Sequence, residues 1–416
     1  MTKVRPFRAI RPVKDKVHLI ASRSVDSYKS NELYAKLAEN PYTFLHIIKP
    51  DFLEEKRNKK YTPELLQKVK NKYNEFLKLN YFVQDEKPSF YIYRQIKPDM
   101  SFTGIIACCS ADDYFNGVIK KHEQTLAAKE ETLKNYLEVC DFNAEPVNLT
   151  YPADTEIDAL TEKIINTEPI YDFTTTDRIR HQVWPVNKRE HVKLIEKRFE
   201  KIPAVYIADG HHRTASSALL AKQKKEKNKN HTGEEGYNFF LSILFPDHEL
   251  KIFDYNRVVK DLNGLTDKNF LKKLSEKFDI EFKGKEIYRP KKLHNFSMYL
   301  SGNWYSLTLK KTYIHKKDPA GSLDASLLSE HVLSPILNIH DLRTDKRIGF
   351  VNGLKGMEGL KTEVDSGRMQ VAFGLYPVSM KQLKEVADAD AIMPPKSTWI
   401  EPKLRSGLII YSLNNP

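Results

Sequence analysis

The sequence has few cysteines and no long apolar run. It holds three cysteines in 416 residues. Cys108 and Cys109 are adjacent within an apolar run and Cys140 stands alone, so no spacing indicates a zinc site or a disulfide framework. The longest apolar runs, such as Phe239–Phe245, are far too short to span a bilayer, and the first residues lack the apolar region of a signal peptide. We expect three buried, reduced thiols in a cytoplasmic protein without a membrane partner.

The chain also lacks the features of a nucleic-acid surface. Its net charge of +12, from 67 basic and 55 acidic residues, permits an anionic partner without specifying one. Much of the excess lies in two lysine-rich stretches, Glu54–Lys60 and Lys222–Asn230, which mix both signs and contain no aromatic residue. No helix-turn-helix signal is present. We therefore expect a small-molecule partner and no nucleic acid, and the sequence does not indicate an oligomeric state.

Strand and helix patterns are interleaved along the whole chain, with no internal repeat. This favours an α/β protein with mixed α+β sheets, and the length allows two or three domains. We predict one region over 1–235 and a second α+β region over 236–416, which completes the site. Apolar patterning also predicts a strand over Tyr42–Lys49 and a hairpin made by Asn238–Phe245 and Leu250–Tyr255.

The most informative stretch follows a short buried strand at Ala204–Ala208. The run Asp209-Gly-His-His-Arg213 forms a polar turn, and an alanine-rich helix is predicted from Thr214. A helix N-terminus offers N–H groups and a positive dipole end, which suit a phosphate. An arginine there can hold phosphate bidentately, and histidines can exchange protons. The simpler interpretation is that Asp209 caps the helix, the glycine permits the turn and the histidines are solvated.

Three other polar motifs lie far away in the sequence. His122-Glu123 sits among lysines and is not a zincin motif, because position 126 is leucine; Glu123 can be a base, a magnesium ligand or a salt-bridged surface group. Arg343 lies in a charged turn that either contacts a ligand or is only salt-bridged. Lys396-Ser-Thr398 lies in a proline-stiffened loop, which is suited to a phosphate or carboxylate because little entropy is lost on binding.

These motifs together resemble a broad bacterial and archaeal family, catalogued as the one-thousand-and-fifteenth domain of unknown function. The resemblance covers nearly the whole chain. It rests on Arg5-Pro-Phe-Arg-Ala9, Asn40-Pro-Tyr-Thr-Phe-Leu-His46, Asp113-Tyr114, Lys121-His-Glu-Gln-Thr125, Tyr206–Arg213, Asp341-Leu-Arg-Thr-Asp345 and Met393-Pro-Pro-Lys-Ser-Thr398.

A second resemblance covers only residues 100–225 or so. This region has the order strand, helix, strand, an Asp-Gly-x-His-Arg turn and a second helix. That order is similar to the core of the ParB and sulfiredoxin superfamily, where the equivalent turn holds nucleotide phosphates. Its members include chromosome-partitioning nucleotide switches, sulfiredoxins and kinases of free serine. Asp209, Gly210, His212 and Arg213 match the motif, and His211 fills its variable position. Sulfiredoxin chemistry needs a cysteine in this turn, where this chain has histidine, so we do not expect it.

The resemblance implies a nucleotide-dependent phosphotransferase that acts on a small hydroxylated metabolite, with free L-serine converted to O-phosphoserine as the leading candidate. Phosphoryl transfer requires positioning, charge neutralisation and a base near the hydroxyl. The alternatives are a ParB-like nucleotide switch that engages DNA or a protein, and a phosphoester hydrolase. The expected roles are ATP or ADP binding by Asp209, Gly210, His212, Arg213 and Thr214; Mg²⁺ binding by Asp209 and Glu123; proton transfer by Glu123, His122 or His211; and substrate binding by Arg343, Lys396, Ser397 and Thr398.

Overall fold

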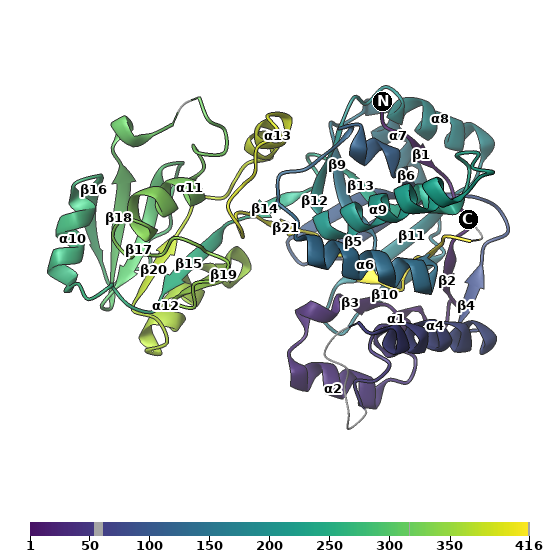
Figure 1. Ribbon diagram of the computed structural model, residues 1–416, viewed down its shortest axis with the longest axis horizontal. Helices are drawn as coiled ribbons and strands as arrows, with labels where there is room; N and C mark the ends of the chain where they lie inside the picture. The colour runs from purple at the N-terminus through teal and green to yellow at the C-terminus, as the bar shows by residue number, and fades with distance from the viewer. Residues whose placement is uncertain (54–60, 316, 415–416) are drawn as a thin grey trace. The chain divides into compact units, whose positions relative to one another are not determined.

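The computed structural model describes residues 1–53, 61–315 and 317–414 (Figure 1). The lysine-rich stretch at 54–60 lies outside these residues. The chain divides into two compact units. Unit 1 comprises Met1–Lys120, Thr125–Leu250 and Pro402–Pro416, and unit 2 comprises Lys121–Gln124 and Lys251–Glu401. Within the described residues, no helix is both long and apolar enough to cross a membrane.

Unit 1 is built on a mixed sheet with the strand order β10-β11-β5-β6-β13-β9-β12-β7, and β1 pairs with β6 outside this path. The β13–β9 and β12–β7 pairs are parallel and the other pairs are antiparallel. The strands are β1 (Val4–Arg5), β5 (Phe90–Lys97), β6 (Met100–Ser110), β7 (Ile119–Lys120), β9 (Val147–Tyr151), β10 (Tyr171–Thr174), β11 (Arg180–Val186), β12 (Val205–Asp209) and β13 (Phe239–Pro246).

Helices and short strand pairs surround this sheet, and Figure 1 shows α6 and α9 side by side. The helices are α1 (Val17–Ile20), α2 (Ser30–Glu39), α3 (Leu45–Ile48), α4 (Pro63–Lys78), α5 (Asp112–Phe115), α6 (Ala127–Cys140), α7 (Thr155–Ile165), α8 (Arg189–Phe199) and α9 (His211–Lys227). The pairs are β2 (Ile10–Pro12) with β4 (Phe82–Gln84), β3 (Ser22–Arg23) with β22 (Arg405–Ser406), and β8 (Phe142–Asn143) with β23 (Tyr411–Ser412).

Both faces of the unit 1 sheet are buried. Along β5, Phe90 and Ile92 belong to one apolar cluster, whereas Tyr91 and Tyr93 belong to another. Successive side chains of a strand point to opposite faces, so a strand that is covered on both sides reads as a continuous apolar run. This explains why β6 carries buried Cys108 next to buried Cys109. All three cysteines are free and buried, as the sequence predicted.

Unit 2 contains an antiparallel sheet with the order β16-β18-β17-β20-β15-β19. Its strands are β15 (Tyr255–Val259), β16 (Phe278–Gly284), β17 (Asn295–Leu300), β18 (Asn303–Leu309), β19 (Ile348–Asn352) and β20 (Val371–Gly374), and β14 (Lys251–Phe253) pairs separately with β21 (Trp399–Glu401). The helices are α10 (Asp267–Ser275), α11 (Asp324–Leu328), α12 (Gly356–Asp365) and α13 (Met380–Asp388). Thr266 caps α10, and its hydroxyl accepts from the Asn269 N–H. The mixed α/β class is therefore confirmed.

Two predicted elements are wrong. The strand expected at Tyr42–Lys49 is a turn followed by the short helix α3, because a brief apolar run fits a buried helix as well as a strand. The hairpin expected from Asn238–Phe245 and Leu250–Tyr255 does not form. Its first half is β13 of the unit 1 sheet, whereas β14 pairs with β21 and β15 pairs with β19 and β20. Strand patterning does not specify the pairing partner, which here comes from about 100 to 150 residues away.

A buried polar network closes unit 1 between β5, β11 and β22. His181 lies between Tyr93, whose hydroxyl is 2.7 Å from Nδ1, and Arg405, whose Nε donates to Nε2 at 3.2 Å. Arg405 also donates to both carboxylate oxygens of Asp177, at 2.7 and 2.8 Å. Because Nε2 accepts from a permanent cation, the neutral ring carries its proton on Nδ1. Arg405, in the C-terminal segment of the chain, is thus fixed to β11 through His181 and to the β10–β11 turn through Asp177.

We expect His181 to make unit 1 sensitive to mild acid. Burial, followed by the positive charge of Arg405, lowers the pKa of His181 to about 3. An unfolded histidine has a pKa of about 6.5, so the unfolded chain binds more protons between these values. The stabilisation is fully present above about pH 6.5 and is lost as pH falls towards 3, with a slope of up to about 1.4 kcal/mol per pH unit. The free energy of unfolding, measured between pH 5 and pH 7.5, should show a smaller slope for His181→Gln. Equal slopes for the two proteins would contradict this assignment.

Candidate functional site

The central turn begins where β12 leaves the sheet. Val205 to Ala208 are buried, and β12 lies between β9 and β7. Its pairing with β9 is irregular between Ile207 and Asp209, so the strand departs from a regular ladder at the point where the polar residues begin. Such irregularities re-aim side chains next to functional sites. The apolar strand therefore ends at Asp209, whose carboxylate is about half exposed.

Gly210 gives the turn its shape. It has φ 102° and ψ 31°, a left-handed conformation that glycine adopts without steric cost. A Cβ at this position would also lie 3.1 Å from Nη2 and 3.2 Å from Nε of Arg213. Glycine therefore allows the turn and leaves room for the guanidinium. Gly210 is itself the N-cap of α9, and no side chain caps that helix. The simpler interpretation, in which Asp209 caps the helix, is thus wrong.

The helix begins at His211, earlier than the predicted start at Thr214. The two histidines and Arg213 consequently form its first turn rather than the loop before it. Thr214 is fully buried, and both its N–H and its hydroxyl donate to the Gly210 carbonyl, at 2.9 and 3.1 Å. We expect Thr214 to support the turn without touching a ligand. The first turn contains no acidic residue, so the positive end of the helix dipole is not offset by a side chain of that turn.

Charged side chains surround the turn. Lys403 Nζ lies 3.1 Å from Asp209 Oδ2. Arg213 Nη1 donates to the Pro146 carbonyl at 2.9 Å and lies 3.7 Å from Glu145 Oε2. Partial removal from solvent would by itself raise the pKa of the Asp209 carboxyl, but the charges of Lys403 and Arg213 outweigh this effect and hold that pKa below its usual value. Asp209 is therefore ionised at neutral pH, and Arg213 is held in place from outside the helix.

The two histidines of the turn have different environments. His211 is buried, with 5% of its surface exposed, so the expectation that it is solvated is wrong. His212 is half-buried, and its Nε2 accepts a hydrogen bond from the Leu126 N–H at 3.1 Å. Burial, together with the charge of Lys129, lowers the pKa of His212. A ring nitrogen that accepts from a backbone N–H carries no proton, so His212 is neutral and joins the start of α9 to the N-cap of α6.

Two residues at this turn were not identified from the sequence. Lys403 is separated from Asp209 by 194 residues and lies outside every motif. Asn148 pairs with Asp209 in the β9–β12 register and is 1% exposed. Its Nδ2 donates to the Pro402 carbonyl at 3.5 Å, whereas its Oδ1 has no hydrogen-bond partner. A buried amide oxygen without a partner is uncommon. The only sequence signal for Asn148 was the presence of an asparagine within an apolar strand.

The other predicted residues belong to unit 2. The Met393 N–H donates to the His122 carbonyl at 2.9 Å, and Arg343 Nη2 donates to Gln124 at 3.2 Å. The short segment 121–124 thus contacts both C-terminal motifs, which the sequence left far apart. His122 is buried, whereas Glu123 and Arg343 are exposed.

The Lys396 loop is held from beneath by a buried arginine. Arg257 is fully buried and donates to the carbonyls of Lys396 at 2.8 Å and Pro395 at 3.2 Å. Burial lowers the pKa of Arg257 to about 10, so it remains charged at neutral pH. The Ser397 hydroxyl donates to the Pro394 carbonyl at 2.7 Å, whereas the Lys396 side chain is exposed. The loop is therefore rigid and presents a cation, with its serine hydroxyl occupied internally.

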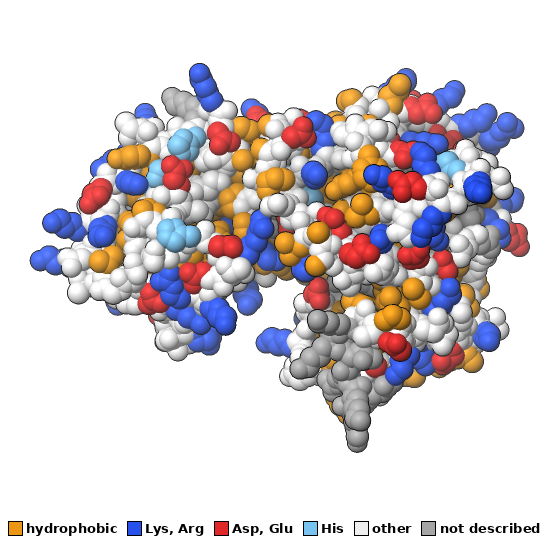
Figure 2. Space-filling view, viewed as in Figure 1, with side chains coloured by type: hydrophobic (Ala, Val, Ile, Leu, Met, Phe, Trp, Pro, Cys, Tyr) orange, Lys and Arg blue, Asp and Glu red, His pale blue; other side chains and the backbone are white. Residues whose placement is uncertain are grey.

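The structure thus separates the predicted residues into two groups. Asp209 to Thr214 lie in unit 1, whereas His122, Glu123, Arg343 and Lys396–Thr398 lie in unit 2. Their action on one substrate remains a prediction. Figure 2 shows basic and acidic side chains interspersed on the viewed face.

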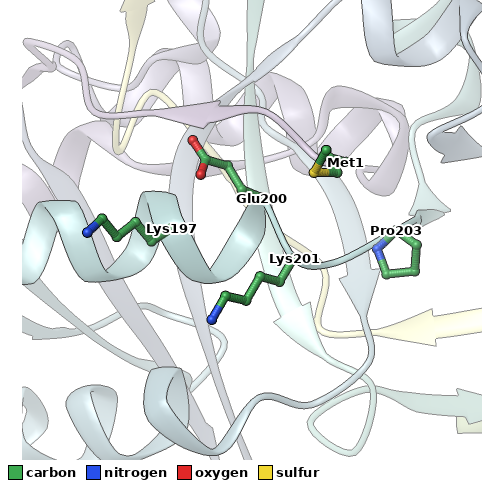
Figure 3. Close-up of a pocket in the computed structure, with 5 residues that line it drawn as sticks. All are labelled: Met1, Lys197, Glu200, Lys201 and Pro203. Atoms are coloured by element: carbon green, nitrogen blue, oxygen red, sulfur yellow. The ribbon is translucent and has the colours of Figure 1, made fainter.

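A depression of about 740 Å³ in unit 1 contains none of these residues. It is lined by Met1, Lys197, Glu200, Lys201 and Pro203 (Figure 3). Glu200 and the two lysines come from the end of α8 and the residues after it. Long surface side chains around an open hollow do not make a catalytic site, so the polar turn remains the better candidate.

The chain is similar to one family model and to several solved structures. A search of curated proteins gave no match. Among solved structures, a free serine kinase in complex with AMP is 13% identical with a TM-score of 0.36, covering 73% of this chain and 91% of that chain. A conserved hypothetical protein from Pyrococcus furiosus is 15% identical with a TM-score of 0.36, covering 74% of this chain and 95% of that chain. The model of the family described as protein of unknown function (DUF1015) matches residues 4–326, which is more than half of the chain. The chain therefore belongs to the DUF1015 family.

Proposed function

We propose that the β12–α9 turn binds the phosphates of a nucleotide, ATP or ADP, and that the chain transfers a phosphoryl group to the hydroxyl of a small metabolite. Free L-serine is the acceptor implied by the resemblance of the Asp-Gly-His-His-Arg motif to the ParB and sulfiredoxin superfamily. The observation that carries the proposal is the start of α9. Gly210 opens the helix in a left-handed conformation, the Arg213 guanidinium lies beside it, and no acid stands in the first turn.

Each residue of the turn has a distinct part in this proposal. The first N–H groups of α9 donate to phosphate oxygens, because the first turn of a helix has no carbonyl for them. Arg213 adds charge-assisted hydrogen bonds, which are shorter and stronger than neutral ones. Neutral His212 adds no positive charge and instead fixes the position of the first turn through Leu126. Together these groups neutralise the charge of the phosphates and orient them.

Magnesium fits the carboxylate present. Asp209 is ionised beside Lys403, and Mg²⁺ prefers one or two carboxylates together with phosphate oxygens and water. Asp209, with Glu123 as the second candidate, would hold the ion, which when bound would offset the negative charge of the phosphates.

The acceptor needs a base and a site for its carboxylate. Glu123 is an exposed carboxylate and suits the removal of a proton from a hydroxyl, whereas buried His122 and His211 are the less accessible candidates. Lys396 and Arg343 are exposed cations of unit 2 that suit the carboxylate of an amino acid. Ser397 and Thr398, in the same loop as Lys396, are also assigned to substrate binding in this proposal.

Incubation of the purified full chain with Mg²⁺, L-serine and either ATP or ADP tests the proposal. We expect O-phosphoserine to form in amounts equal to the nucleotide consumed, and Glu123→Gln to lower the rate with little change in nucleotide affinity. Nucleotide binding without transfer to serine or any other hydroxylated amino acid would favour a nucleotide switch. Release of phosphate from phosphoserine without nucleotide would favour a hydrolase.

A further inference from the structure

A second cluster of chemically active side chains lies in unit 2, apart from every motif discussed above. His315, Glu330 and His331 each offer one ligand atom, and these atoms all lie within 4.8 Å of one another. Glu330 and His331 are adjacent in the sequence, whereas His315 comes from the segment that follows β18. Two imidazoles and one carboxylate at this spacing match the usual set of three protein ligands for a metal with open positions.

The backbone that carries Glu330 and His331 is unusual. After α11, residues Ser329–Leu333 form a π-helical turn, in which the Ser334 N–H donates to the Ser329 carbonyl at 2.9 Å. Such turns are rare, occur mostly as single insertions and are frequent at functional sites. Here the turn leaves Glu330 exposed and buries His331. Glu330 therefore approaches the cluster from the solvent side, whereas His331 approaches it from the protein interior.

His331 supplies an independent sign of a ligand. Its side chain is 3% exposed, and its Nε2 lies 3.2 Å from the Tyr313 carbonyl. A carbonyl can only accept, so the neutral ring carries its proton on Nε2 and its lone pair on Nδ1. That Nδ1 is buried and has no hydrogen-bond partner. Metal-binding histidines commonly donate their other ring N–H to a backbone carbonyl in this way.

The other two ligands already lie in contact. His315 Nε2 is 2.8 Å from Glu330 Oε2, and both side chains are about half exposed. Without the third residue, this would be an ordinary surface pair that contributes little. The buried ring of His331, which offers a ligand atom within 4.8 Å of those of His315 and Glu330, distinguishes the cluster from such a pair.

We propose that His315, Glu330 and His331 bind one divalent transition-metal ion of the zinc class, with water or a ligand in the remaining position. Imidazole nitrogen selects zinc-like ions, whereas Mg²⁺ and Ca²⁺ prefer all-oxygen sets. The half-exposed His315 and Glu330 leave the ion accessible from solvent. This proposal is independent of nucleotide binding, because it uses no residue of the β12–α9 turn.

Calorimetric titration of Zn²⁺ into the full chain, prepared without an affinity tag and stripped with EDTA, tests this site. We expect one equivalent to bind, with no competition from millimolar Mg²⁺, and Co²⁺ should give visible absorption bands on binding. His315→Ala and Glu330→Gln each remove a proposed ligand and should weaken binding by more than the roughly 10- to 100-fold that loss of an outer-shell partner costs. Both positions are exposed, so neither change should unfold the protein.

His340→Ala is the matched control, because His340 is an exposed histidine of the same unit that bonds only to Asn338 and Ser334 in the described structure. It should bind Zn²⁺ as the unmodified protein does. The proposal is overturned if the unmodified chain binds no stoichiometric Zn²⁺, or if His315→Ala and Glu330→Gln bind as tightly as His340→Ala. Zn²⁺ binding with unchanged stoichiometry in an Arg213→Ala protein would show that the two sites are separate.

Discussion

Replacement of Arg213 with alanine is expected to weaken nucleotide binding by about 10- to 100-fold. The guanidinium lies next to Gly210, at the positive end of α9, where phosphate oxygens are proposed to bind. A hydrogen bond to a charged group contributes about 1.5–3 kcal/mol, which corresponds to this range of dissociation constants. Calorimetric titration of ADP and ATP into both proteins measures the change.

Lysine at the same position should recover only part of the affinity. It keeps the positive charge but lacks the planar fork that binds two phosphate oxygens at once. Arg189→Ala is a suitable control, because Arg189 is an exposed arginine in the first turn of another helix of unit 1, α8. It should bind nucleotide as the unmodified protein does.

Loss of affinity must be separated from loss of structure, because Arg213 also donates to the Pro146 carbonyl. The free energy of unfolding of Arg213→Ala should fall by no more than about 1.5–3 kcal/mol, because the donor of that bond is charged. Normal nucleotide affinity in a folded Arg213→Ala protein would exclude this arginine from the phosphate site.

Replacement of Arg405 with alanine should lower the free energy of unfolding by about 2–4 kcal/mol. The Arg405 side chain is 4% exposed and pairs with Asp177, whose side chain is 30% exposed. It also donates to His181 and to Thr175 at 3.0 Å. Truncation leaves the Asp177 carboxylate and the buried His181 nitrogen without this donor. Urea denaturation followed by circular dichroism measures the change.

Arg180→Ala is the matched comparison for this ion pair. Arg180 pairs with Asp172 on the neighbouring strand at 2.5 Å, but both side chains are substantially exposed, at 51% and 35%. Exposed pairs contribute about 0–1 kcal/mol, so Arg180→Ala should be nearly neutral. Equal losses in the two variants would mean that burial does not determine the contribution of Arg405.

Local patterns in the sequence predicted the elements of the site but not the contacts that complete it. The apolar strand at Ala204–Ala208 and the following Asp-Gly pair predicted the end of β12 to within one residue. The start of α9 was misplaced because histidine and arginine have no strong preference at helix starts, and because Gly210 rather than a polar side chain is the N-cap. Lys403 lies 194 residues from Asp209 in the sequence, so only the tertiary structure brings it to the turn.

The pairing of strands was the least predictable part. β14 and β15 were patterned like the second half of a hairpin, yet they pair with strands from the C-terminal part of the chain. A hydrophobic pattern indicates that a strand has a buried face, whereas the packing of the whole unit determines which strand it pairs with. The π-turn that carries Glu330 and His331 had no sequence signal either, because its residues continue an ordinary helical pattern.

The most direct test of the phosphate site is amide hydrogen exchange of the full chain with and without saturating ADP and Mg²⁺. The proposed contacts involve backbone N–H groups of the first turn of α9, so nucleotide should slow exchange in peptides that cover residues 205–216. The lysine-rich end of α9, around residues 222–227, should exchange equally in both states. Nucleotide-dependent protection confined to other parts of the chain, or none at all, would contradict the assignment of the β12–α9 turn as the nucleotide site.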